Sequence, residues 1–133
     1  FAAKLDAAGT ALVFSTYLGG TNQDRCARIA ADVEGNTYVV GYTFSPDFTT
    51  VKPFQPAIGG NSDAFVVKFS NTGTTVYSTF LGGNRDELGY GIAVDGGRSV
   101  WVTGGSFSTN FPLVNSFPIP PGKLLPSRGL SPC

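Results

Sequence analysis

Two pairs of carboxylates are the residues of this sequence whose types and spacing could support catalysis. Asp24 and Asp86 each follow a Gly-Gly dipeptide closely, and Asp32 and Asp95 each end a short apolar run. Two carboxylates hydrolyse a glycosidic bond when their environments differ, so that one acts as acid and the other as base. Carboxylates at matching positions of two similar segments have similar environments, so these pairs do not meet that requirement. We therefore expect these side chains to cap turns, and we retain Asp24 and Asp86 as candidate ligand-binding residues.

Oxygen ligands suitable for calcium occur together in one loop, at Asp32, Glu34 and Asn36. The matching loop, residues 95–99, keeps a single carboxylate, so the charge that would hold a cation is lost there. We accordingly expect no bound metal and no cofactor.

The sequence contains no histidine, which excludes any mechanism that needs an imidazole from this chain. Lys and Arg total 9, as do Asp and Glu, so zero net charge gives no electrostatic attraction for nucleic acid or anionic lipid. Its apolar runs are far shorter than the ~20 residues of a membrane-spanning helix. These features predict a non-catalytic protein with no nucleic-acid partner and no membrane insertion.

Aromatic side chains are further candidates for ligand contact, because their faces stack on sugar rings. Tyr38 and Trp101 alternate with small and β-branched neighbours, which favours packing in a core over ligand contact. Phe48 and Phe111 have polar neighbours and follow predicted strands, so we interpret them as exposed candidate ligand-binding residues. A shallow carbohydrate site could use these two rings.

Cys26 and Cys133 allow one disulfide, although one of them is the last residue of the chain. The alternative is that Cys26 is a small buried side chain and Cys133 a free thiol. Both alternatives stay open.

The sequence repeats itself with a period of 63 to 64 residues, for example at 14–20 (FSTYLGG) and 77–83 (YSTFLGG). Each unit contains four runs of β-branched and aromatic residues bounded by Gly, Asn and Asp, which predict short strands and no helix. The expected strands are residues 1–5, 11–18, 29–33 and 37–42, then 64–69, 75–81, 91–94 and 99–103.

Four short antiparallel strands repeated at a fixed period are typical of a β-propeller blade, with a tandem sandwich as the alternative. The predicted fold class is all-β, with two four-stranded antiparallel propeller blades. The first blade spans 1–44, a connection rich in Pro and Gly spans 45–62, the second blade spans 63–108, and a loop with a Pro-rich tail spans 109–133. Six mid-strand residues should be buried, namely Leu18, Ile29, Val39, Leu81, Ile92 and Val102.

Several motifs of the second unit, in order DAFVVK (63–68), YSTFLGG (77–83), GYGIAVD (89–95) and VWVTG (100–104), resemble the bacterial seven-bladed β-propeller repeat family. The resemblance extends over about residues 1–117. It implies a secreted or cell-surface bacterial protein with a binding or scaffold role, and it supplies no catalytic residue. The first unit departs from the pattern at residues 24–28 (DRCAR), where the second has Gly-Tyr-Gly.

Two blades cannot close a ring, because propellers have about four to eight, and an unclosed pair exposes apolar faces. The chain contains no Met and begins at Phe1, so we expect a processed product or a fragment. The faces should be covered by copies of the chain, in a homo-oligomer or filament, or by further sequence. The predicted function is a non-catalytic secreted or cell-surface scaffold or interaction module. The alternatives are a carbohydrate-binding lectin of assembled blades and a fragment of an extracellular hydrolase.

Overall fold

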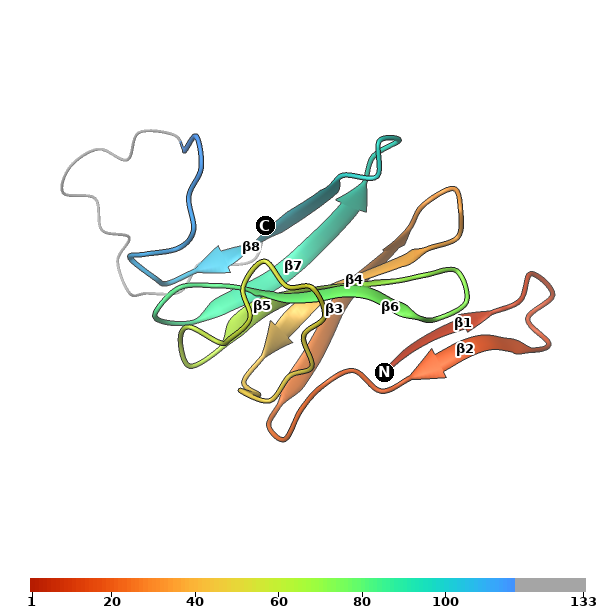
Figure 1. Ribbon diagram of the computed structural model, residues 1–133, viewed down its shortest axis with the longest axis horizontal. Coiled ribbons are helices and arrows are strands. Elements are labelled where there is room, and N and C mark those ends of the chain that lie inside the picture. Colours follow the sequence, from red (N-terminus) through yellow and green to blue (C-terminus); the bar gives the residue numbers. More distant parts are fainter. Residues whose placement is uncertain (117–133) are drawn as a thin grey trace.

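The computed structural model describes residues 1–116, and these consist of strands and loops (Figure 1). Each of the eight predicted strands overlaps an observed strand, but the third and the seventh begin five and four residues earlier than predicted. They are β1 (Ala2–Leu5), β2 (Leu12–Thr16), β3 (Asp24–Ala31), β4 (Thr37–Thr43), β5 (Asp63–Phe69), β6 (Thr75–Leu81), β7 (Glu87–Val94) and β8 (Val100–Ser106). The all-β prediction is confirmed, since residues 1–116 contain no helix. The Pro-rich tail from residue 117 and the predicted alternatives for Cys133 lie outside the described residues.

The strands pair across the two sequence units instead of within them. β3, β4, β5 and β6 form one four-stranded antiparallel sheet, while β1–β2 and β7–β8 are separate hairpins. β4 ends the first unit and β5 begins the second, yet they pair without interruption from Thr37 opposite Phe69 to Thr43 opposite Asp63. The expectation that each unit forms its own four-stranded sheet was therefore wrong. A repeat pattern gives the period of the strands but not the strand at which a sheet begins.

The two middle strands of the central sheet, β4 and β5, are apolar on both faces, which explains their central place. All residues of β4 and β5 are buried except Tyr42 and Lys68, which are half-buried. Strands buried on both faces read as nearly continuous apolar runs, as in YVVGY and AFVVKF. The outer edge of β6 is also covered, because Val51 and Gln55 of the 45–62 connection pair with Ser78 and Phe80.

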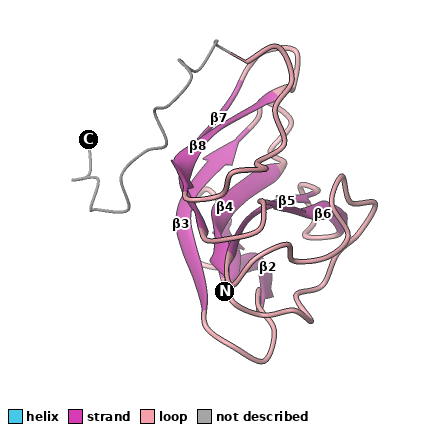
Figure 2. Ribbon diagram, turned by 90° about the vertical axis from the view of Figure 1, so that its left-hand side faces the viewer, coloured by secondary structure: helices cyan, strands magenta, loops and turns pink. Residues whose placement is uncertain are grey.

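The two hairpins lie on opposite faces of the central sheet (Figures 1 and 2). Ala2 of β1 and Phe14 of β2 pack on the face that carries Phe65 and Val67 of β5. β7 lies on the other face, which carries Val40, opposite Val66 in the register. The described chain is thus a half sheet, a whole sheet and a second half sheet, stacked in that order.

Burial of the six predicted core residues depends on whether a neighbouring layer is present. Val39 is 2 % exposed, as predicted, but Ile29 is 59 % exposed, so the prediction for Ile29 was wrong. Ile29 pairs with Val39 on the β1–β2 side of the central sheet, beyond the short β1, where no other strand of residues 1–116 covers β3. The other four, Leu18, Leu81, Ile92 and Val102, are half-buried.

Candidate functional site

Asp24 binds two loops of its own chain. Its carboxylate accepts hydrogen bonds from the Gly20 amide at 2.8 Å and from the hydroxyl groups of Thr43 and Ser45. Both hydroxyl side chains are fully buried. The carboxylate thereby ties the connection before β3 to the connection after β4, as expected of a side chain that caps turns.

The second unit repeats this cluster around Glu87, which lies 63 positions after Asp24. Glu87 accepts hydrogen bonds from the Gly83 amide and the Ser106 hydroxyl, both at 2.7 Å. We call the two clusters, centred on Asp24 and Glu87, the loop clasps. Asp86, which the sequence analysis matched with Asp24, accepts instead from Asn61 and Ser62, both at 3.0 Å. Counting four residues from the second glycine of each Gly-Gly pair would have identified Glu87.

The outer hydrogen bonds of the two loop clasps also correspond. The Thr21 amide donates to Asp47 at 2.9 Å, and the Asn84 amide donates to Asn110 at 2.8 Å. Because the same geometry recurs with an amide in place of a carboxylate, a negative charge is not required there.

Two acidic side chains are fully enclosed, Asp63 at 0 % and Glu87 at 1 % exposure. Burial raises the pKa of Asp63, with a further contribution from the charge of Glu87, against the lowering effect of hydrogen bonds from Gly59 and Gln55. An acid–base pair must touch its substrate. These two carboxylates are closed off from solvent and hold the fold.

Phe48 is a core residue, so its interpretation as an exposed side chain was wrong. It is 4 % exposed, and its ring is stacked on Phe65 with centroids 4.6 Å apart and tilted against Phe80 at 5.8 Å. The 45–62 connection folds back along β6 and carries the ring inward. The equivalent Phe111 is half-buried.

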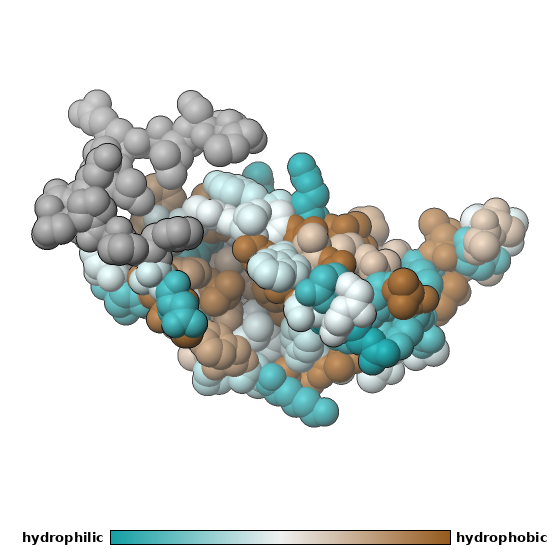
Figure 3. Space-filling model, turned by 90° about the horizontal axis from the view of Figure 1, so that it is seen from above, coloured by the Kyte–Doolittle hydropathy of each residue, from teal (hydrophilic) through white to brown (hydrophobic). Residues whose placement is uncertain are grey.

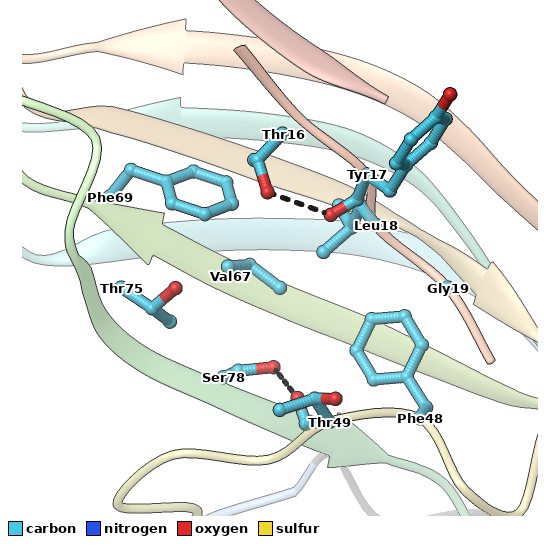
Figure 4. A pocket seen from close by; sticks show the side chains of 10 residues that line it. All are labelled: Thr16, Tyr17, Leu18, Gly19, Phe48, Thr49, Val67, Phe69, Thr75 and Ser78. Carbon is cyan, nitrogen blue, oxygen red and sulfur yellow. Dashed lines mark hydrogen bonds between the residues drawn. The ribbon is translucent and has the colours of Figure 1, made fainter. Parts of the chain in front are cut away.

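A cleft of about 220 Å³ lies between the segment after β2 and the β5–β6 hairpin (Figure 4). Phe48, Val67 and Phe69 give it apolar walls. The Ser78 hydroxyl lies in it and donates to the Thr49 carbonyl at 2.7 Å, and Tyr17, 96 % exposed, stands at its rim. The lining residues are Thr16, Tyr17, Leu18, Gly19, Phe48, Thr49, Val67, Phe69, Thr75 and Ser78. An exposed aromatic ring is suited to contact with a sugar ring.

Tyr38 and Trp101 occupy equivalent positions with opposite exposure. The Tyr38 hydroxyl donates to Asp32 and the Trp101 indole nitrogen donates to Asp95, each at 3.0 Å. Tyr38 is fully buried and Trp101 is 64 % exposed. The difference arises because β5 lies beside β4 and places the Lys68 ammonium 4.9 Å from the Tyr38 ring centroid. The core prediction is confirmed for Tyr38 and wrong for Trp101, whose strand has no such neighbour in residues 1–116.

The loop considered for calcium is held together by Asp32. Its two oxygens accept hydrogen bonds from the amides of Glu34 and Asn36 and from the side chains of Asn36 and Tyr38, at 2.8 to 3.0 Å. Within residues 1–116, no three His, Cys, Asp or Glu side chains are grouped to hold a metal ion. The same part of the chain has no helix with the length and hydropathy needed to cross a bilayer.

Comparison with known proteins gives one family. Among curated proteins, none matches the chain. Residues 13–48 match the family model described as a beta-propeller repeat. The matched segment runs from β2 of one half sheet through β3 and β4 of the central sheet, so it spans parts of two sheets. Residues 13–48 of this chain are thus similar to a β-propeller repeat.

Proposed function

We propose that this protein is a non-catalytic interaction module, a scaffold of β-propeller repeats that acts in secreted form or at the cell surface and assembles with copies of itself. The observation that carries the proposal is the pair of incomplete sheets. β1 and β8 each have an edge with no partner strand in residues 1–116, whereas the equivalent edges of β5 and β4 are paired with each other. An unpaired strand edge is a template for another strand.

Exposure of equivalent residues supports the proposal. Phe1 is 81 % exposed and its equivalent Phe65 is fully buried, while Leu5 is 58 % exposed and its equivalent Phe69 is 2 % exposed. Apolar residues also lie among polar ones on the face shown in Figure 3. Exposed apolar surface next to open strand edges marks a site of association.

The non-catalytic part of the proposal rests on residue chemistry. The chain contains no histidine. The carboxylates of Asp24, Asp32 and Glu87 each accept several hydrogen bonds from nearby loops. The location outside the cell or at its surface rests on the family resemblance of the sequence.

The mass of the chain in solution tests the proposal. Sedimentation or light scattering should give a multiple of 13.9 kDa at micromolar concentration. Thr103→Lys places a charge on the β8 edge and should lower the assembled fraction, because lysines protect edge strands from pairing. Val33→Lys, at a fully exposed loop position, is the matched control and should leave the mass unchanged. A stable monomer at these concentrations refutes the proposal.

Glycan binding at the cleft below Tyr17 is a second candidate function. It is favoured by the exposed ring of Tyr17 in the cleft lining, which also contains the Thr16 and Thr75 side chains. A glycan array should then give signals that Tyr17→Ala abolishes. An array without signals for the unmodified chain counts against this candidate.

A further inference from the structure

We infer that the open edge of β8 pairs antiparallel with β1 of a second copy of this chain, and that the incoming β7–β8 hairpin fills the slot between β1 and β3 of that copy. The inference rests on the proposed self-assembly and specifies its interface. The template for the interface is inside the chain, in the pairing of β4 with β5.

The repeat gives the equivalent strands on each side of the proposed junction. β8 corresponds to β4 at a shift of 63 residues, and β1 corresponds to β5 at a shift of 64. The pair formed by β8 and β1 would therefore be a second version of the pair that already joins the two units.

The same shifts give the register. Val39 lies opposite Val67, and Val40 lies opposite Val66. The corresponding residues at the junction are Val102 opposite Ala3 and Thr103 opposite Ala2, on alternate faces of the new sheet. The junction would join the two hairpins into one four-stranded sheet like the central one.

The slot for the incoming hairpin is visible independently of the repeat. In the central sheet, β4 lies beside its partner β5 and against β7, where Gly89 contacts the Val40 side chain and the Gly41 carbonyl. The equivalent place between β1 and β3 is an open groove of about 290 Å³. Its mostly apolar lining consists of Phe1, Ala2, Ala3, Cys26, Ala27, Arg28, Ile29 and Val39.

A cation and an aromatic ring complement each other at the proposed junction. Tyr38 lies opposite Lys68, whose ammonium is 4.9 Å from the ring centroid. By the same shifts, Lys4 would lie opposite Trp101, which is 64 % exposed and belongs to the residue type with the strongest cation–π attraction. The Lys4 ammonium also donates to the Gly35 carbonyl at 3.0 Å. It also donates to the Asn71 carbonyl at 3.3 Å, so both bonds would have to yield for the ammonium to reach the Trp101 ring.

One residue makes the junction differ from its template. A Cβ atom at Gly89 would lie 2.6 Å from the Gly41 carbonyl oxygen and 2.7 Å from a methyl carbon of Val40. Cys26 occupies the equivalent position and carries both Cβ and Sγ. The two copies must therefore stand further apart at this point than β7 stands from β4, while the edge pairing of β8 with β1 does not pass through Cys26.

The number of strands in each copy is compatible with closed rings. Each copy brings one whole sheet and two half sheets, which amount to two blades. Rings of two, three or four copies would then have about four, six or eight blades, the range found in propellers.

Cysteine pairing between two variant chains tests the register. Both chains carry Cys26→Ser and Cys133→Ser, and one also carries Val102→Cys while the other carries Ala3→Cys. Opposite residues in an antiparallel pair have Cα atoms about 4.5 to 5.5 Å apart, within the range of a disulfide. Mild oxidation of the mixture should give a disulfide-linked dimer of the two chains. Thr103→Cys mixed with Ala2→Cys should do the same.

The exchanged mixtures are the matched controls. Val102→Cys with Ala2→Cys, and Thr103→Cys with Ala3→Cys, place the sulfurs on opposite faces of the sheet and should give at least tenfold less dimer. Equal yields in all four mixtures, or dimer only in the exchanged ones, overturn the inference.

The mass of each mixture before oxidation separates this inference from the proposed function. Assembled chains that form no disulfide in the matched mixtures refute the register and leave self-assembly intact, whereas a monomer refutes both. Because the variants could themselves weaken folding, the unmodified chain gives an independent reading. Trp101 is the only tryptophan, so its emission should move to shorter wavelength as the mass increases. Emission that is unchanged on assembly overturns the inference.

Discussion

Carboxylates in this protein hold loops, and Asp32 shows the consequence for pH. Loss of hydration raises the pKa of Asp32, but hydrogen bonds from Asn36, Tyr38 and the Glu34 amide outweigh it and hold this pKa at about 2, below the ordinary value of 3.8. In the unfolded chain these bonds are absent. The resulting stability is complete above pH about 4 and is lost as the pH falls through the folded-state pKa.

We expect Asp32→Asn to flatten the pH dependence of unfolding between pH 4 and 2. Urea titrations at several pH values measure the free energy of unfolding for both proteins. The curves should converge toward low pH, where the carboxylate of the unmodified chain is protonated. A difference between them that is constant from pH 5 to 2 would contradict this account.

Phe48 and Phe111 provide a matched comparison of one ring in two settings. Phe48→Ala removes a ring that is stacked on Phe65 and tilted against Phe80, and the cavity should cost about 3 to 5 kcal/mol of stability. Phe111→Ala removes a half-buried ring and should cost less than about half as much. Chemical denaturation of the two variants measures both values. Equal losses of stability would show that the packing of Phe48 against Phe65 and Phe80 does not stabilise the fold.

At the scale of the strands, each loop clasp joins the connection before a hairpin to the far end of the same hairpin, β3–β4 or β7–β8. Thr43→Val keeps the shape of the side chain but removes a hydroxyl that donates to Asp24 and accepts from the Ser45 amide. Leaving buried polar groups unpaired should cost about 1 to 3 kcal/mol in a denaturant titration. Thr43→Ser is the control and should cost less, because Ser106 has the same role around Glu87. A larger loss for the serine variant would contradict the clasp.

The strands could be predicted from the sequence and their pairing could not. Alternation and turn residues locate β5 and β6 to within a residue, since these are local properties. The choice of β5 as the partner of β4 depends on an 18-residue connection, 45–62, whose path is set by contacts far apart in the sequence. The path of the same connection also places Phe48 in the core. Trp101 and Ile29 were predicted as core residues from their places within strands, but both are exposed in residues 1–116, because burial depends on which strands lie beside and above them.

At the scale of the whole molecule, Cys26 is the residue at which the proposed junction departs from the internal one. Cys26→Gly restores the residue type found at position 89 and removes two atoms from the slot between β1 and β3. We expect this variant to assemble at a several-fold lower concentration than the unmodified chain. Sedimentation across a dilution series measures the shift. Cys26→Ser, which retains the bulk, is the control, and an equal shift for both variants would contradict the spacing argument.

The offset between repeat and sheet has a consequence for how such a chain can grow. Because one half sheet comes before the central sheet and the complementary half comes after it in residues 1–116, inserting or deleting one entire repeat between them leaves both halves unchanged. Gene duplication thus changes the number of repeats in single steps while every version keeps the same two half sheets, the ones we infer to pair between copies. Had the sheets coincided with the repeats, each added unit would have met its neighbour through faces alone, with no backbone ladder across the boundary. Because of the half-repeat offset, the number of repeats can change without a change in the two half sheets.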